Sequence, residues 1–264
     1  MNKLEMLISS VNAEGDKLIE KMHIACDGVL INQCGRDGYY ELPVDGGTIR
    51  VFEYAQKGVG VSRNHAIDEA KGDIFLFADE DIVYDDGYVS KVLDEFTKHP
   101  EADLLFFNIR VCDERRTYYN TDFARCHIYN AGRYPAYSIA VRGDKLRASG
   151  VHYSTLFGGG AKYSCGEDSI FIKDCLKAGL RLYRTPVEIG EEVPRPSTWF
   201  TGYNEKFFFD RGVMYHFLYG VLAGVFGFRF VYTKKKEMCR DIPANKAFKL
   251  LLDGIKEGKR IDHD

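Results

Sequence analysis

Short blocks of apolar and polar residues alternate along the first 110 positions. Apolar runs bounded by turn residues predict strands, at 4–11, 29–34, 48–54, 73–79 and 102–111. Apolar residues at three- and four-residue intervals predict helices between them, at 15–26, 62–72 (with Ser62 as N-cap) and 86–100. Strands that alternate with helices favour an α/β fold with a single, mainly parallel sheet flanked by helices.

Residues 35–47 are rich in turn formers and predict a loop. The alternation weakens after residue 110. Later elements are a strand at 137–143, a loop at 157–168, a helix at 168–178 and a strand at 181–190. We expect one domain over 1–205, with a nucleotide half at 1–110 and an acceptor half at 111–205. Residues 206–264 would form a C-terminal helical and aromatic extension.

The extension contains an almost wholly apolar run at 212–232, followed by three lysines. Its length is near the roughly 20 residues that span a bilayer. Four interpretations stay open: a buried core helix, a homodimer surface, an interfacial helix or a membrane span. Gly220, Gly224 and Gly227 permit close helix packing but weaken an isolated helix. Peripheral membrane contact through 207–236 is one expectation.

Composition excludes some classes of protein. The net charge of −3 lacks the basic footprint of nucleic-acid binding, so we expect no nucleic-acid partner. Seven cysteines without a CxxC spacing indicate reduced thiols. The first residues enter a predicted strand directly, so we expect no signal peptide. We therefore expect a cytoplasmic protein. The inner face of the cytoplasmic membrane is one possible location.

Three consecutive acids, Asp79, Glu80 and Asp81, end the apolar strand at 73–79. Burial and mutual repulsion both oppose such a cluster. Bound Mn²⁺ or Mg²⁺ would offset both costs, because these cations prefer oxygen ligands and share substrate phosphates. An EF-hand is excluded because Tyr84 occupies the position that requires glycine. The alternative is a solvated acidic loop.

A second motif is the glycine loop "GVGVSR" at 58–63. Glycines before a helix N-terminus can bind phosphate through backbone N–H groups, and Arg63 adds a cation. The loop also resembles a dinucleotide fingerprint, with Asp79 about 20 residues downstream. However, Arg63 replaces the third glycine, and that alternative leaves three adjacent acids unexplained.

A third motif is "GGGAKYSCGED" at 158–168. Its glycines allow close approach of the backbone to a ligand. Glu167 and Asp168 then begin a helix. They could simply stabilise the helix N-terminus, or one of them could act as a general base. No nucleophile elbow or P-loop occurs in the sequence.

The order and spacing of "GVGVSRNHAIDEAKGDIFLFADED" and "GEDSIF" resemble those of the family 2 glycosyltransferases, over roughly residues 4–185. The resemblance implies a GT-A nucleotide-diphospho-sugar transferase fold. It also implies an inverting, metal-dependent hexosyltransferase-type enzyme. Such an enzyme moves a sugar from a nucleotide-diphosphate donor to a hydroxyl of a glycan or lipid-linked acceptor.

The resemblance also implies roles for individual residues. The metal would be bound by Asp81 and by Asp79, which is also a candidate ligand of the donor ribose. Asp168 would be the catalytic base, with Glu167 as second choice. The remaining donor-binding candidates are Ser9, Ser10, Gln33, Arg63, Asp79 and Glu80.

One position departs from the family pattern. The acid that usually follows the second strand is replaced by "NQCGRDG", so Gln33 or Asp37 would take its place. Uridine is the nucleotide we expect. Gly159, Gly160 and Trp199 are candidates for binding the acceptor, because aromatic faces stack on sugar rings. Core packing is the other interpretation of Trp199.

Two further functions remain as alternatives. A sugar-phosphate nucleotidyltransferase has a similar nucleotide half, but its glycine-rich loop follows the first strand, where this chain has "SSVNAEGDK". A non-catalytic nucleotide- or membrane-binding protein of the same fold is the other. The presence of Asp79, Asp81 and Asp168 argues against it.

Overall fold

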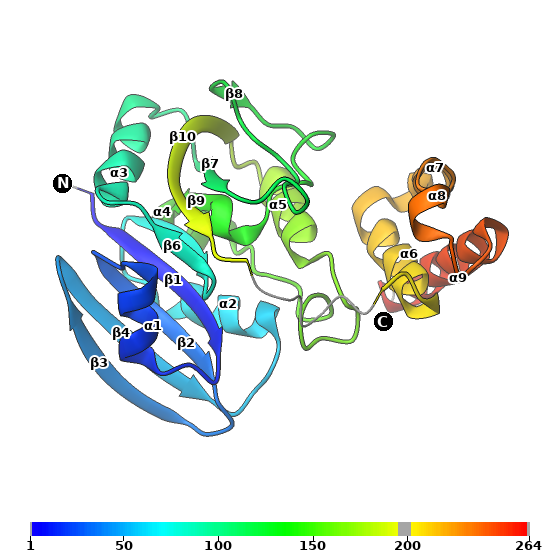
Figure 1. Ribbon diagram of the computed structural model, residues 1–264. Coiled ribbons are helices and arrows are strands. Elements are labelled where there is room, and N and C mark those ends of the chain that lie inside the picture. Colours follow the sequence, from blue (N-terminus) through cyan, green and yellow to red (C-terminus); the bar gives the residue numbers. More distant parts are fainter. Residues whose placement is uncertain (1, 195–201, 263–264) are drawn as a thin grey trace.

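The computed structural model describes residues 2–194 and 202–262. A ten-stranded sheet dominates the described part of the chain, with helices on both faces (Figure 1). The strands are β1 (Leu4–Val11), β2 (Asp27–Gln33), β3 (Gly38–Val44), β4 (Gly47–Tyr54), β5 (Ile74–Asp79), β6 (Ile82–Tyr84), β7 (Leu104–Arg110), β8 (Ala124–Arg125), β9 (Ile139–Arg142) and β10 (Leu182–Glu192). The sheet confirms the predicted α/β class.

The sheet order is β3-β4-β2-β1-β5-β9-β7-β10-β6, and β8 pairs with β10. Strands β4, β2, β1 and β5 run parallel to one another, and β7 runs parallel to β10. Between β5 and β7 lies β9, which is antiparallel to both. The parallel part carries the candidate site, because the carboxyl ends of its strands meet at one edge.

Alternate residues of each central strand face opposite helical layers, as the strand period of two requires. The helices of the catalytic part are α1 (Gly15–Met22), α2 (Val59–Glu69), α3 (Tyr88–Lys98), α4 (Gly143–Ser149) and α5 (Glu167–Lys177). Met6 and Ile8 of β1 lie in the core with α1 and α3. Leu7 lies in the other core, with α2, α4 and α5.

Two local predictions were wrong. The expected loop at 35–47 contains β3, an antiparallel partner of β4. Turn-forming residues at both its ends hid a seven-residue strand whose outer positions are exposed. Helix α2 begins at Val59, with Gly58 in the N-cap position, so Ser62 is not the N-cap. Ser62 instead lies inside the helix and is buried.

The C-terminal segment is helical and stands to one side of the sheet in Figure 1. Its elements are α6 (Glu205–Tyr219), the short 3₁₀ turn η2 (Gly220–Leu222), α7 (Ala223–Thr233), α8 (Lys235–Met238) and α9 (Ala244–Ile261). Helices α6 and α9 touch at Gly212 and Gly254. A Cβ on Gly212 would lie 2.0 Å from the carbonyl oxygen of Leu251, so only glycine permits this approach.

The apolar run that suggested a membrane contact is divided by a turn. Gly220 has φ 53° and ψ −122°, which is not helical, and it separates α6 from α7. By length and composition the stretch Glu205–Thr233 could cross a membrane, and 28% of its most apolar window is buried. One side of α6 and α7 packs on α9, while Val221, Leu222, Val225 and Phe228 are exposed. The domain boundary after residue 205 stays a prediction.

Candidate active site

The candidate site lies where the parallel strands end. In open α/β sheets, ligands bind beyond this edge. Ser9 of β1 stands beside Asp79 of β5, and Ser10 stands beside Asn32 of β2. The Ser62 hydroxyl of α2 donates a hydrogen bond to Ser9 Oγ (3.0 Å). The strand register therefore brings two predicted donor residues, Ser9 and Asp79, next to α2.

Arg63 is the centre of the site. Its side chain is only 5% exposed. Nη1 donates to Asp168 Oδ1 (2.7 Å), and Nη2 donates to Asp79 Oδ1 (3.1 Å). Nη1 also lies 3.7 Å from Glu167 Oε1. One guanidinium thus joins the predicted donor-side acid to both candidates for the catalytic base.

Asp168 is held from two sides. Its Oδ1 accepts from Arg63, and its Oδ2 accepts from the backbone N–H of Ala136 (3.1 Å). Burial raises the pKa of Asp168 to about 7, against the opposing attraction of Arg63, and the nearby Glu167 and Asp79 raise it further. A carboxylate with this pKa can take up a proton near neutral pH, as a general base must.

Helix α6 supports the loop that precedes Asp168. The buried carboxylate of Asp210 accepts from the Ser164 N–H (2.9 Å) and from Lys206 Nζ (2.6 Å). Gly166, the N-cap of α5, has φ 118°, and a Cβ there would lie 2.6 Å from Met214. The C-terminal helices therefore help to fix the start of α5.

The acidic cluster does not converge on one point. Asp79 is paired with Arg63, whereas Glu80 Oε2 accepts from the Val11 N–H (3.1 Å). Asp81 is buried. Within residues 2–194 and 202–262, no three His, Cys, Asp or Glu side chains gather as a ready metal site. The carboxylates of Asp79 and Asp81 are nevertheless suitable ligands for Mg²⁺ or Mn²⁺. Such an ion often binds one or two carboxylates and completes its coordination shell with phosphates and water.

The two glycine loops contact each other. The Val59 N–H donates to the Gly159 carbonyl (2.9 Å), and a Cβ on Gly160 would lie 3.2 Å from Gly58. A Cβ on Gly60 would lie 2.5 Å from the Ser154 carbonyl. Glycine is therefore needed at these positions for packing between the loops. The first N–H of α2 is used inside the protein, which weakens the dinucleotide and anion-site interpretations of residues 58–63.

Gly158 links these loops to the candidate base. It has φ +100°, and an added Cβ would lie 2.6 Å from Val59 and 2.8 Å from Glu167. Gly159 and Gly160 consequently lie close to the start of α5. Their role in binding the acceptor stays a prediction. Trp199, the third acceptor candidate, lies outside the described residues.

Gln33 and Asp37 are the two candidates for the residue that contacts the nucleotide's base. Gln33 is buried at the end of β2, beside Val11 of β1. Asp37 is exposed, and its carboxylate accepts from the Ala55 N–H (3.1 Å). Gln33 is better placed to contact a nucleotide, because it lies at the edge where the parallel strands end.

Sequence reasoning missed two residues at the site. Asn32 is buried and ties β2 to the loop after β1, because its side chain bonds both N–H and C=O of Ala13 (3.0 and 2.9 Å). Tyr153 lies under Arg63, with the guanidinium carbon 5.0 Å from the ring centre. Tyr153 also stacks on Phe171 of α5 at 4.0 Å. Their positions depend on tertiary packing and carry no local signal.

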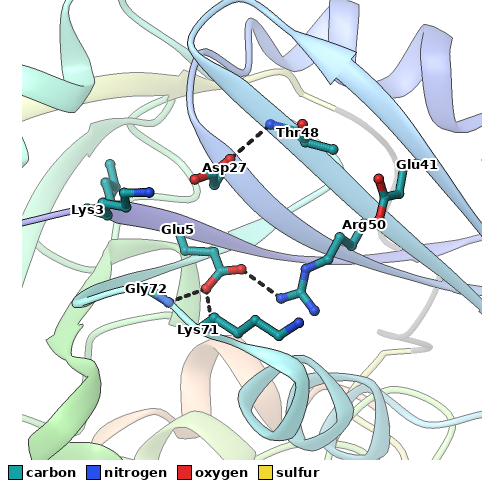
Figure 2. Close-up of a pocket in the computed structure, with 9 residues that line it drawn as sticks. Lys3, Glu5, Asp27, Glu41, Thr48, Arg50, Lys71 and Gly72 are labelled. Atoms are coloured by element: carbon teal, nitrogen blue, oxygen red, sulfur yellow. Dashed lines mark hydrogen bonds and ion pairs between the residues drawn. The ribbon is translucent and has the colours of Figure 1, made fainter.

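A separate cavity of about 310 Å³ lies at the opposite edge of the sheet, among the amino ends of the strands (Figure 2). Glu5 occupies its wall. One carboxylate oxygen of Glu5 accepts from the N–H groups of Lys71 and Gly72 (2.6 Å each), and the other accepts from Arg50 (2.9 Å). These polar groups satisfy one another, so we interpret this cavity as structural.

Comparison with known proteins identifies the family. A sequence model described as glycosyl transferase family 2 matches residues 25–154, a segment that contains Arg63 and the acids Asp79–Asp81. Residues 25–154 belong to this family, and the protein is a glycosyltransferase. A comparison with curated proteins found no match.

Solved structures of another protein have the same fold as this chain. The chain is similar to S. aureus TarS 1–349, with a TM-score of 0.63 and 13% identity over 99% of this chain and 82% of that chain. A complex of TarS 1–349 with UDP-GlcNAc gives a TM-score of 0.64, again at 13% identity, over 99% and 83% of the two chains. At this identity the likeness establishes the fold. It confirms the expected GT-A architecture.

Proposed function

We propose that this glycosyltransferase uses a UDP-sugar as donor and inverts the anomeric centre as it transfers the sugar to a glycan hydroxyl. The observation that carries the proposal is the chain of contacts from Asp79 through Arg63 to Asp168. These contacts bring Asp79, the proposed donor-side acid, and Asp168, the proposed base, together at one edge of the sheet. The similar fold of TarS in complex with UDP-GlcNAc supports uridine as the nucleotide.

Asp168 is the proposed general base. It would take the proton of the acceptor hydroxyl as that oxygen attacks the anomeric carbon from the face opposite the diphosphate. Arg63 and the Ala136 N–H hold its two oxygens in place. General-base help of this kind is worth about 10²–10⁴-fold in rate. Glu167, near the same guanidinium, is the second candidate.

The donor half would be held by the ends of β1, β2 and β5. Ser9, Ser10 and Gln33 lie on the side where the nucleoside would bind, with Glu80 holding the end of β1. Asp81 and Asp79 would hold Mn²⁺ or Mg²⁺, which when bound stabilises the charge that develops on the leaving diphosphate.

The stereochemistry can be tested without knowing the acceptor. Many transferases slowly pass the sugar to water, and UDP-GlcNAc has an α-configured anomeric carbon. Early proton NMR spectra of the full chain with UDP-GlcNAc and Mn²⁺ should show the β-anomer of the free sugar before mutarotation. Initial release of the α-anomer would exclude inversion. Asp168→Asn is the control that should suppress the signal.

Membrane contact is part of the same proposal. The turn between α6 and α7 presents Val221 (100% exposed), and α7 presents Val225 (67%) and Phe228 (52%). Arg229 and Lys234–Lys236 follow closely. Exposed apolar side chains flanked by cations suit the interface of an anionic bilayer. This arrangement supports an acceptor presented at the inner face of the cytoplasmic membrane. A homodimer through the same surface is the competing outcome.

A further inference from the structure

A second cavity, of about 200 Å³, lies between α5 and α6 beside the candidate base. Ser169, Ile172 and Lys173 line it from one face of α5, because residues three and four apart share a helix face. Arg211, Tyr215 and Tyr219 line it from α6. We call this space the α5–α6 groove.

Arg211 brings a partly unsatisfied guanidinium group to the groove. Its Nε is buried without a hydrogen-bond partner. Among the described residues its contacts are with aromatic rings: the guanidinium carbon lies 5.1 Å from the ring centre of Phe207 and 5.3 Å from that of Phe230. The neighbouring acid, Asp210, is occupied by Ser164 and Lys206.

The opposite wall adds a second cation. Lys173 of α5 donates from Nζ to the carbonyl of Phe217, so the ammonium group is held at the groove. None of the described residues that line the groove is acidic. Two cations without a carboxylate between them are unfavourable when partly buried, unless an anion joins them.

The groove starts next to the proposed chemistry. Ser169 directly follows Asp168, and its hydroxyl donates to the Gly132 carbonyl (3.0 Å) on the third wall. Lys173 is five residues beyond Asp168 along α5, which corresponds to about 7–8 Å of helix rise. An acceptor with its hydroxyl at Asp168 would therefore place its neighbouring unit in the groove.

We propose that the α5–α6 groove binds an anionic group of the acceptor, a phosphate or a carboxylate attached close to the sugar-accepting hydroxyl. Arg211 is the main contact, because its planar guanidinium matches both anions with paired N–H donors. Lys173 supplies the second charge. The assignment rests on the proposed function, since it makes the anion part of the acceptor.

The test uses two small probes, glycerol 1-phosphate and glucuronate, with neutral glycerol as the blank. Each is titrated calorimetrically into the full chain with and without saturating UDP and Mn²⁺. We expect one anionic probe to bind and glycerol not to bind. The probe that binds identifies phosphate or carboxylate as the acceptor's charge. In Arg211→Met, which keeps the stem over the aromatic rings, binding should weaken tenfold or more.

Two further variants make the result specific. Arg211→Lys keeps the charge and should recover part of the affinity, while Arg240→Met removes an exposed arginine outside the groove and should change nothing. Equal affinity in Arg211→Met and the unmodified chain, or no binding of either probe, would overturn the proposal. Failure of UDP to bind, with probe binding still dependent on Arg211, would instead count against the proposed donor.

Discussion

Nη1 of Arg63 lies 2.7 Å from Oδ1 of Asp168, although 105 residues separate the two in the sequence. The same guanidinium contacts Asp79 at 3.1 Å. Arg63 is therefore not a free cation available to phosphate, because both carboxylates already pair with it. Arg63 links the donor side of the site to the proposed base. A change in the charge or position of one carboxylate should therefore alter the interactions of the other.

The pH dependence of the rate should report Asp168. Its pKa is raised to about 7 by burial, so the base is protonated below that pH and ionised above it. We expect kcat/KM of donor hydrolysis to fall about tenfold per pH unit below pH 7 and to level off above it. Asp168→Asn should lower the rate about 10²–10⁴-fold and flatten the acid limb. An acid limb that persists in Asp168→Asn would assign it to another group.

Removing Arg63 should destabilise the fold. Arg63→Met leaves Asp79 and Asp168 without their shared cation in a largely buried site. Breaking a buried pair in this way costs about 3–5 kcal/mol, which urea denaturation can measure. Arg229→Met, an exposed arginine, is the matched control and should stay within about 0.5 kcal/mol of the unmodified chain. A loss below about 1 kcal/mol for Arg63→Met would mean that the contacts with Asp79 and Asp168 contribute little.

The cavity in Figure 2 should matter for stability and not for nucleotide binding. Glu5→Gln replaces one carboxylate oxygen, and the new amide cannot accept from Lys71, Gly72 and Arg50 together. We expect a loss of about 2–4 kcal/mol in unfolding free energy, with the Kd for UDP unchanged. A tenfold change in that Kd would show that this edge belongs to the donor site.

The exposed turn after α6 should control membrane binding. The double variant Val221→Asp, Val225→Asp places charge on the most exposed apolar side chains of this region. Sedimentation with vesicles containing anionic lipid should show at least a tenfold loss of binding. Tyr129→Asp, which changes an exposed aromatic residue on a loop beside the sheet, should bind as before. If dimerisation is lost instead, the surface is a subunit interface.

The sequence predicted the parallel part of the sheet because its strands are apolar runs separated by amphipathic helices. The run Phe75–Ala78 is almost wholly buried, as expected. The strand β3 escaped prediction because it is a half-exposed edge strand that starts and ends in turn residues. Helix α4 was missed because it is only seven residues long and gives little periodicity.

The sequence could identify which acids are candidates for the site, but it could not predict their positions relative to one another. The motifs containing Asp79 and Asp168 were recognisable from local order. That Arg63 would join them, and that Tyr153 would lie beneath it, follows from long-range packing. The contact of Arg211 with Phe230 depends in the same way on how α7 folds back on α6, whereas Phe207 is a neighbour of Arg211 within α6.

The most direct test of the account is a thermal-shift comparison of UDP, GDP, CDP and dTDP with the full chain, with and without Mn²⁺, together with NAD⁺. UDP at about 100 times its Kd should add about 2.7 kcal/mol of stability. That corresponds to a rise of roughly 5–10 °C in Tm for a chain of this size. We predict that this rise depends on Mn²⁺ and that Asp81→Asn removes the Mn²⁺-dependent part. Stabilisation by NAD⁺ but not by UDP, or no response to any nucleotide, would contradict the account.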